Sequence, residues 1–297
     1  MRHGNAEGSE MLRANGLWIQ RGFAIRGDYE RILVQYYHAA VTQFDFAGNP
    51  EQARIDINFW TANQTKGKIQ QLFAPGSLGK DTRMVLTSAL YFHGLWASEF
   101  QDADTHVAPF RVSARETAQV ATMNQTAPFG YAETPAAQVL EMKYGHSPLV
   151  FDILLPKTME GLSALEASLT PDKLSAFWNA LSSRPVAVSL PRFRVEADVS
   201  LRDALGHLGV SDAFGANADF SAIDDRRDLR LADFRHKAYI EVAEQGTVAA
   251  AVSSGAVRLA ASGPPPTAFR ADHPFLFLIR DPHTGIILFA GRLMRPK

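Results

Sequence analysis

The chain has 297 residues, of which 46% are hydrophobic and 21% charged, which is the composition of an ordinary globular protein. Its 30 Lys and Arg residues balance 31 Asp and Glu residues, so no charge excess attracts nucleic acid or anionic lipid. No apolar stretch reaches the roughly 18 to 20 residues that a membrane-spanning helix needs, and the first residues show no signal peptide. The absence of cysteine excludes disulfides, thiolate metal sites and cysteine nucleophiles, and it does not reveal the compartment.

The first third of the chain predicts two helices and a central strand. A core-facing helix is predicted over residues 27–46 from apolar residues spaced by three and four: Tyr29, Leu33, Tyr36, Tyr37 and Ala40. A second helix is predicted over residues 50–66 and ends at Gly67, with an inward face made of Ile55, Phe59 and Ala62. Residues 82–92 are apolar on both faces, which predicts a strand covered on both sides.

The rest of the chain predicts short strands and few helices. The strand candidates are FRVSA, TAQVATM, PFGYAE, VLEMKY, LVFDILLP, AVSLPRFRVEA, residues 229–245, HPFLFLIRD and GIILFAGRLM. Helices are predicted over residues 161–181 and 201–208. No linker, repeat or charge block divides the chain, so we predict one domain over residues 1–297 of the α+β class, with helices packed on sheets.

One segment does not suit an ordinary connection. Residues 244–269 read EQGTVAAAVSSGAVRLAASGPPPTAF, whereas structureless loops beyond roughly 12–15 residues are usually functional or disordered. A flexible linker or exposed insertion is one interpretation of this composition. A second is a loop that can become a strand, because small residues alternate along it and three prolines stiffen its end. The alternating residues are Thr247, Ala249, Ala251, Ser253 and Gly255.

Several segments resemble the serpin family, in the family's order. They are ANGLWIQRGF, INFWTANQTKGKI, LTSALYFHGLWASEF, LPRFRVEAD, ADFSAI, RHKAYIEVAEQGTVAAA and DHPFLFLIRDPHTGIILFAGRLMRP. The resemblance covers residues 12–297 and implies the serpin fold, with a large mixed central sheet, two further antiparallel sheets and surrounding helices. It begins at the second strand of the family's main sheet, so the family's first helices are missing. Apolar surface beneath the sheet would then be exposed, which predicts an unstable chain.

The resemblance also implies a function. Residues 244–268 correspond to an exposed bait loop that a serine or cysteine protease attacks, after which the loop inserts into the main sheet and the acyl-enzyme is trapped. This predicts a monomeric suicide inhibitor that is not an enzyme, needs no cofactor and acts outside the cell or in the periplasm. A non-inhibitory or inert serpin-like protein is the alternative. No G-x-S-x-G, H-E-x-x-H, Walker or Rossmann motif suggests an enzyme instead.

The resemblance assigns the residues of the bait loop. Those that match the family's insertion hinge are Glu244, Gly246, Thr247, Val248, Ala249, Ala250 and Ala251. Val248 replaces an acid common in the family, but it faces outward in the alternation. The usual loop length places the attacked bond between Ala260 and Ala261, where a small residue suits an elastase-like enzyme. Shifted registers would present Leu259 to chymotrypsin- or subtilisin-like enzymes, or Arg258 to trypsin-like ones.

Three residues match the regions that the family uses to open its main sheet. Trp96 stands in the breach strand, and Ser88 stands where the shutter strand usually has Asn. His236 keeps the shutter histidine, and we interpret it as a buried, hydrogen-bonded core residue rather than a catalytic base.

Overall fold

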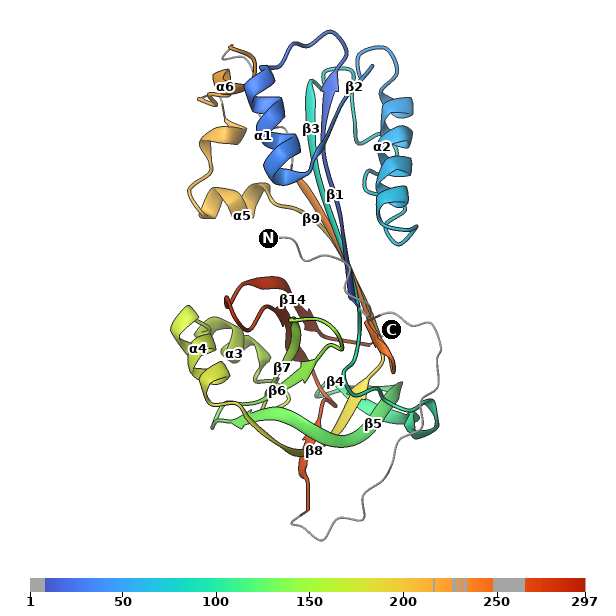
Figure 1. Cartoon of the computed structure of the whole chain (residues 1–297), viewed down its shortest axis with the longest axis vertical. Helices are drawn as coiled ribbons and strands as arrows, with labels where there is room; N and C mark the ends of the chain where they lie inside the picture. The colour runs from blue at the N-terminus through green and yellow to red at the C-terminus, as the bar shows by residue number, and fades with distance from the viewer. Residues whose placement is uncertain are drawn as a thin grey trace. The chain divides into compact units, whose positions relative to one another are not determined.

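The structure is a computed structural model that describes residues 9–215, 217–225, 229, 231, 234–247 and 265–296. The chain forms two compact units: unit 1 comprises Met1–Glu10, His93–Val195 and Ile240–Lys297, and unit 2 comprises Met11–Phe92 and Glu196–Tyr239. Four strands contribute residues to both units: β1 (Ser9–Gln20), β3 (Met84–Leu95), β9 (Phe193–Ser200) and β10 (Arg235–Val242) (Figure 1). One domain over residues 1–297 stays a prediction.

Unit 2 contains strands with helices on both sides (Figure 1). Its further elements are β1 (Ser9–Gln20), α1 (Gly27–Tyr37), β2 (Ala40–Phe44), α2 (Pro50–Gln64), α5 (Arg202–His207), a 3₁₀ turn (Asp212–Phe214) and α6 (Ser221–Asp224). Neighbouring residues of β3 point to opposite faces, because Val85 packs in the cluster with α2 and Met84 in the cluster with α1. The prediction of a central strand covered on both sides is therefore confirmed.

A six-stranded sheet has the order β2-β1-β3-β10-β9, and the short strand β11 (Gly246–Thr247) also pairs with β3. The β1–β2 and β3–β10 pairs are parallel, whereas β11 runs antiparallel to β3. The predicted mixed sheet is confirmed. The strand predicted over residues 229–245 is shorter than expected, because β10 spans only Arg235–Val242.

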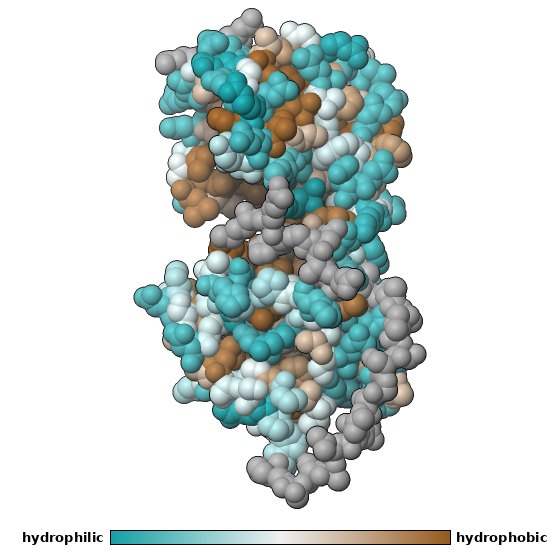
Figure 2. All heavy atoms as spheres, in the orientation of Figure 1, coloured by the Kyte–Doolittle hydropathy of each residue, from teal (hydrophilic) through white to brown (hydrophobic). Residues whose placement is uncertain are grey.

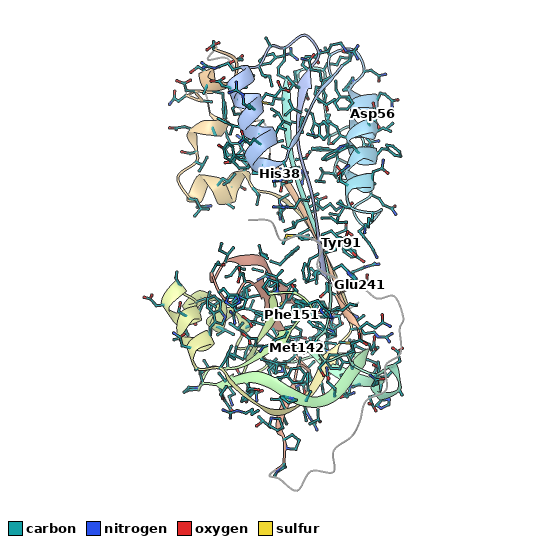
Figure 3. The ribbon with its side chains drawn as sticks, in the orientation of Figure 1. His38, Asp56, Tyr91, Met142, Phe151 and Glu241 are labelled. Atoms are coloured by element: carbon teal, nitrogen blue, oxygen red, sulfur yellow. The ribbon has the colours of Figure 1, made fainter. Side chains whose placement is uncertain are left out.

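The first predicted helix is also shorter than expected. α1 ends at Tyr37, where His38, labelled in Figure 3, adopts a left-handed backbone with φ of 49°, and residues 40–44 form β2 instead. Tyr36 and Tyr37 are 70% and 61% exposed, so they do not belong to the core-facing stripe. Tyr29 and Leu33 do pack against the core.

The inward face of α2 was predicted wrongly. Phe59 is 69% exposed and Ile55 is 45% exposed, whereas Ala53, Ile57 and Thr61 are buried. The inward face of the helix is therefore the one that carries Ile57 and Trp60, which pack in the same apolar cluster. Phe59 and Ile55 are among the exposed hydrophobic residues of unit 2, whose surface shows hydrophobic patches in Figure 2.

A buried polar side chain of α2 also holds the segment that follows the helix. The side-chain oxygen of Asn58 accepts hydrogen bonds from the backbone N–H groups of Leu72 and Phe73, both at 2.9 Å, and its amide donates to the Phe73 carbonyl at 2.9 Å. These bonds tie the segment after α2 to the helix, and an apolar pattern cannot reveal them. Gly67 closes the helix end as predicted, with φ of 76° and a hydrogen bond to the Ala62 carbonyl at 2.7 Å.

Unit 1 is built on an eight-stranded sheet of order β12-β8-β5-β6-β7-β13-β14, with β4 also paired to β5. Its elements are a 3₁₀ turn (Asp102–Asp104), β4 (His106–Ser113), β5 (Glu116–Glu133), β6 (Ala137–Lys143), β7 (Val150–Pro156), α3 (Leu162–Ser168), α4 (Pro171–Asn179), β8 (Ser182–Pro191), β12 (Thr267–Arg270), β13 (Phe275–Arg280) and β14 (Ile287–Leu293). Helices α3 and α4 cover the apolar face that includes Leu154 and Leu278.

Unit 1 differs from the predictions in two respects. The α+β class is confirmed, but the two further sheets are joined within the described residues, because the 18-residue strand β5 pairs with β4 through its first part and with β6 through its last. The helix predicted over residues 161–181 is divided into α3 and α4. Thr170 caps α4 and Pro171 begins it, since proline lacks the N–H that a continuous helix would need.

No helix among the residues that the structure describes is long and apolar enough to cross a bilayer.

Candidate functional site

The predicted hinge begins in a tight turn after β10. The backbone N–H of Gly246 donates to the Ala243 carbonyl at 3.1 Å, and the N–H of Ala243 donates to the Gly246 carbonyl at 2.8 Å. The chain then enters β11, in which Gly246 lies opposite Leu95 and Thr247 lies opposite Gly94 of β3. The first two residues after the turn are thus already paired with the main sheet.

Gly246 is required by the geometry of this turn. Its φ is 150°, which side chains of L residues rarely adopt. A Cβ at this position would overlap the carbonyl oxygen of Gly94 and lie 2.7 Å from the Cα of Leu95. Only glycine lets the chain approach β3 this closely.

Thr247 is fully buried and anchored by a side chain that the sequence did not single out. Its hydroxyl lies 2.9 Å from the Tyr144 hydroxyl, which comes from the segment just after β6. The Tyr144 ring stacks on Trp96, with ring centroids 4.7 Å apart and planes 12° apart. Burial raises the pKa of Tyr144 well above its ordinary value, so the hydroxyl stays neutral and can act as a donor or an acceptor.

Trp96 holds the backbone of the turn itself. Its indole N–H donates to the Ala243 carbonyl at 2.9 Å, and its backbone N–H donates to the Gln245 carbonyl at 2.8 Å. Its ring also meets Phe151 of β7, labelled in Figure 3, at a centroid distance of 5.6 Å. Trp96 therefore connects the turn to the core of unit 1.

Glu244 is buried within the turn and carries a charge. Its carboxylate accepts hydrogen bonds from the Arg192 guanidinium and the Thr105 hydroxyl, both at 2.5 Å. Burial by itself would raise the pKa of Glu244, but these two hydrogen bonds outweigh it and leave the pKa below its ordinary value. The carboxylate is therefore ionised at neutral pH and fastens the turn to the segments that carry Thr105 and Arg192.

The two predicted shutter residues are neighbours in unit 2. Ser88 of β3 lies opposite His236 of β10 in a parallel ladder that joins Thr87–Tyr91 to Arg235–Tyr239. His236 is only half-buried, and no hydrogen bond to its ring is found among the described residues. The prediction that His236 is buried is therefore not met, whereas its role as a structural residue rather than a catalytic base stays a prediction.

The remaining predicted positions of the bait loop lie outside the described residues. They are Val248, Ala249, Ala250, Ala251, Arg258, Leu259, Ala260 and Ala261.

Sequence reasoning missed Tyr144, Arg192 and Thr105, which hold the hinge. Tyr144 lies 103 residues from Thr247, and no local pattern links residues so far apart. In the part of the chain that the structure describes, no group of three His, Cys, Asp or Glu side chains could hold a metal ion.

Comparison with known proteins agrees with this arrangement. The family model described as Serpin (serine protease inhibitor) matches residues 2–296. An uncharacterized serpin-like protein of Thermococcus kodakarensis is 39% identical over 98% of this chain and 68% of its own length. The leukocyte elastase inhibitor of Sus scrofa is 38% identical over 95% of this chain and 77% of its own.

Solved structures give the same result. Uncleaved ovalbumin is similar with a TM-score of 0.88 and 31% identity, over 99% of this chain and 76% of the ovalbumin chain. A highly specific serpin of the insect Tenebrio molitor is similar with a TM-score of 0.87 and 34% identity, over 99% of this chain and 78% of its own. The match over nearly the whole sequence, together with the shared fold, shows that the chain belongs to the serpin family.

Proposed function

We propose that this serpin is a suicide inhibitor of serine or cysteine proteases, with residues 244–268 as its bait. The observation that carries the proposal is the pairing of Gly246 and Thr247 with the end of β3. β3 pairs directly with β10 over Thr87–Tyr91 and Arg235–Tyr239. A strand that continues from β11 would therefore have to separate these two parallel strands and take its place between them.

The register of β11 indicates how far such a strand could extend. β3 has 12 residues, Met84–Leu95, so a strand that starts opposite Leu95 would use residues 246–257 to reach Met84. Residues on the buried face of Thr247 recur at every second position. They are Ala249, Ala251, Ser253, Gly255 and Val257, all of them uncharged and none larger than valine. Insertion would bury no bulky or charged side chain on that face.

The chemical step uses the protease's own machinery. The protease's hydroxyl or thiol would attack the Ala260 carbonyl, and the amide bond to Ala261 would break as the protease's acid gives a proton to the departing amine. An ester or thioester then links Ala260 to the protease while residues 246–257 insert. Leu259 and Arg258 remain as the shifted alternatives. An elastase-like target is supported by small side chains at the bait bond and by similarity to leukocyte elastase inhibitors.

Incubation with elastase tests the proposal. We expect a covalent complex that survives denaturing electrophoresis, together with a free peptide that begins at Ala261. Clipping of the loop with no complex would favour the alternative, a non-inhibitory serpin. An extracellular or periplasmic location and a monomeric state stay predictions.

A pair of matched variants separates insertion from recognition. Ala249→Arg places a charge on the face that would be buried, so cleavage should continue while the trapped fraction falls at least about tenfold. Val248→Arg places the same charge on the opposite face and should trap protease almost as well as the wild type. Equal trapping by the two variants would contradict the proposed insertion.

A further inference from the structure

Unit 1 contains a cluster of buried charges that the proposed inhibition does not use. Asp152 of β7 is fully buried, and Arg280 of β13 is 2% exposed. The Arg280 side chain donates to the Asp152 carboxylate at 2.5 Å through Nε and to the Glu141 carboxylate of β6 at 2.5 Å through Nη2. One guanidinium thus serves two carboxylates, so the three groups carry a net negative charge when both acids are ionised.

The neighbouring groups do not balance this charge. The indole of Trp178 from α4 covers the Arg280 guanidinium, with 4.5 Å between the guanidinium carbon and the ring centroid. The other titratable group that interacts with Asp152 is the neutral hydroxyl of Tyr144, on the segment after β6. Among the described residues, no second cation forms an ion pair with Asp152 or Glu141. The excess charge is therefore held beside a fully buried carboxylate, that of Asp152.

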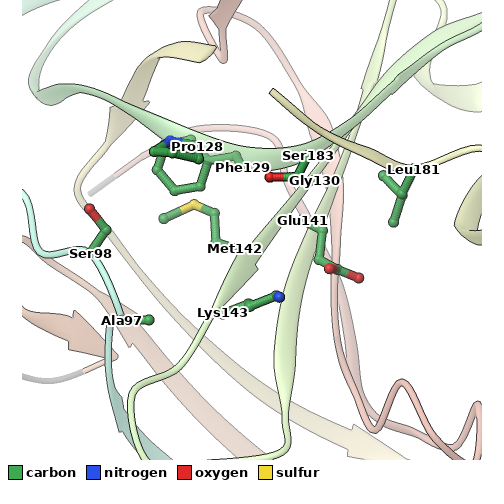
Figure 4. A pocket seen from close by; sticks show the side chains of 10 residues that line it. All are labelled: Ala97, Ser98, Pro128, Phe129, Gly130, Glu141, Met142, Lys143, Leu181 and Ser183. Carbon is green, nitrogen blue, oxygen red and sulfur yellow. The ribbon is translucent and has the colours of Figure 1, made fainter. Parts of the chain in front are cut away.

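A cavity gives protons access to the cluster. It has a volume of about 360 Å³, and its lining includes Glu141, Lys143, Gly130 and Ser183 (Figure 4). Figure 4 labels these residues, of which Glu141 and Lys143 belong to β6, Gly130 to β5 and Ser183 to β8. The Glu141 side chain is 15% exposed, and the same carboxylate is bonded to Arg280. Solvent can therefore reach the Glu141 end of the cluster without unfolding of the sheet, and Glu141 is joined to Asp152 through Arg280.

We propose that the Asp152–Arg280–Glu141 cluster is a proton switch, in which Asp152 takes up one proton from solvent on mild acidification and the eight-stranded sheet becomes harder to unfold. Protonation leaves Arg280 with one charged partner, Glu141, and removes the buried excess charge. The protonated carboxyl keeps an acceptor oxygen for the Arg280 N–H.

The direction of the effect follows from proton linkage. Burial raises the pKa of Asp152 to about 6, and the hydrogen bond and charge of Arg280 do not fully offset it. In the unfolded chain an aspartate titrates near about 3.9, so the folded state binds more protons between these two values. The contribution of Asp152 to the free energy of unfolding is therefore lowest above a pH of about 6. It increases as the pH falls toward about 4.

The test compares the full chain with Asp152→Asn, a near-isosteric change that removes the titrating group. Between pH 7.5 and 5.0 the ratio of folded to unfolded wild-type protein should increase about tenfold relative to Asp152→Asn. Urea unfolding gives this ratio, with hydrogen exchange of β7 and β13 amides as the reporter for unit 1. Asp172→Asn, at an exposed position in the first turn of α4, should follow the wild type. Parallel pH profiles of wild type and Asp152→Asn would overturn the proposal.

A second measurement does not depend on the variant folding. In a ¹³C spectrum of the wild-type protein, one aspartate carboxyl should titrate near pH 6. If every aspartate carboxyl titrates below about pH 5, the switch does not exist. Neither measurement involves a protease, so failure of the switch and failure of the proposed inhibition are distinguishable.

Discussion

Replacement of Gly246 by alanine tests the hinge at its most constrained point. The new Cβ would overlap the Gly94 carbonyl oxygen and lie 2.7 Å from the Leu95 Cα, and these backbone atoms of β3 cannot move aside as a flexible side chain could. The backbone conformation itself costs an alanine about 1–3 kcal/mol. Relief requires Gly246 to leave β3, which breaks the β11 pairing and the bond between Thr247 and Tyr144, at about 1 kcal/mol per hydrogen bond.

Together these terms disfavour the docked hinge by about 3–5 kcal/mol, or at least about a hundredfold in its equilibrium. Hydrogen exchange should show much faster exchange of the hinge amides, and incubation with elastase should give a smaller trapped fraction. Gly206→Ala is the matched control, because Gly206 lies in α5 with no atom within 4 Å of an added Cβ. Unchanged hinge exchange and unchanged trapping in Gly246→Ala would refute the reasoning.

Three further variants test other contacts of the structure. Glu244→Gln removes the charge that its arginine partner binds, so it should lower the free energy of unfolding by about 1–2 kcal/mol at pH 7. A carboxylate with a lowered pKa stabilises the fold only while it is ionised. In urea unfolding, the difference in free energy of unfolding between the wild type and Glu244→Gln should therefore shrink as the pH falls through the pKa of Glu244. A difference that stays constant with pH would contradict this prediction. Tyr144→Phe removes only the hydroxyl that contacts the Thr247 hydroxyl. The backbone amides of the hinge should then exchange hydrogen about fivefold faster. Unchanged hydrogen exchange would show that this hydrogen bond does not hold the hinge. Asn58→Ala should lower the free energy of unfolding of unit 2 by about 3 kcal/mol in urea unfolding. Phe59→Ala, at a 69% exposed position, should change it by less than about 0.5 kcal/mol. The reverse order would mean that Phe59, and not Asn58, lies on the buried face of α2.

Patterns that repeat within one element were predictable from sequence. The strand over residues 82–92 showed apolar side chains on both faces, and the structure covers both faces of β3. The order of the family's segments predicted Gly246 and Thr247 as hinge residues, and the structure pairs both with β3. In the first case the residues that decide the structure lie within one short segment. In the second case the order of segments along the whole chain carries the information.

The same reasoning failed at the inward face of α2. Phe59 and Ile55 were predicted to face inward, but Ile57 and Trp60 pack against the core instead, on a helix that also buries Asn58, whose amide group bonds the backbone of residues 72 and 73. A hydrophobic pattern reflects only the free energy gained when apolar surface is buried away from water. It contains no information about buried hydrogen bonds, whose free energies are of similar size.

By itself, the sequence determined the α+β class, the strand that lies at the centre of the main sheet, and the small residues of the proposed bait. Only the tertiary structure decided that Tyr144 holds Thr247 and that Arg280 serves both Asp152 and Glu141. These partners lie more than 100 residues apart along the chain. Chain folding brings them together, and their energies depend on distances of a few ångströms that no local pattern contains.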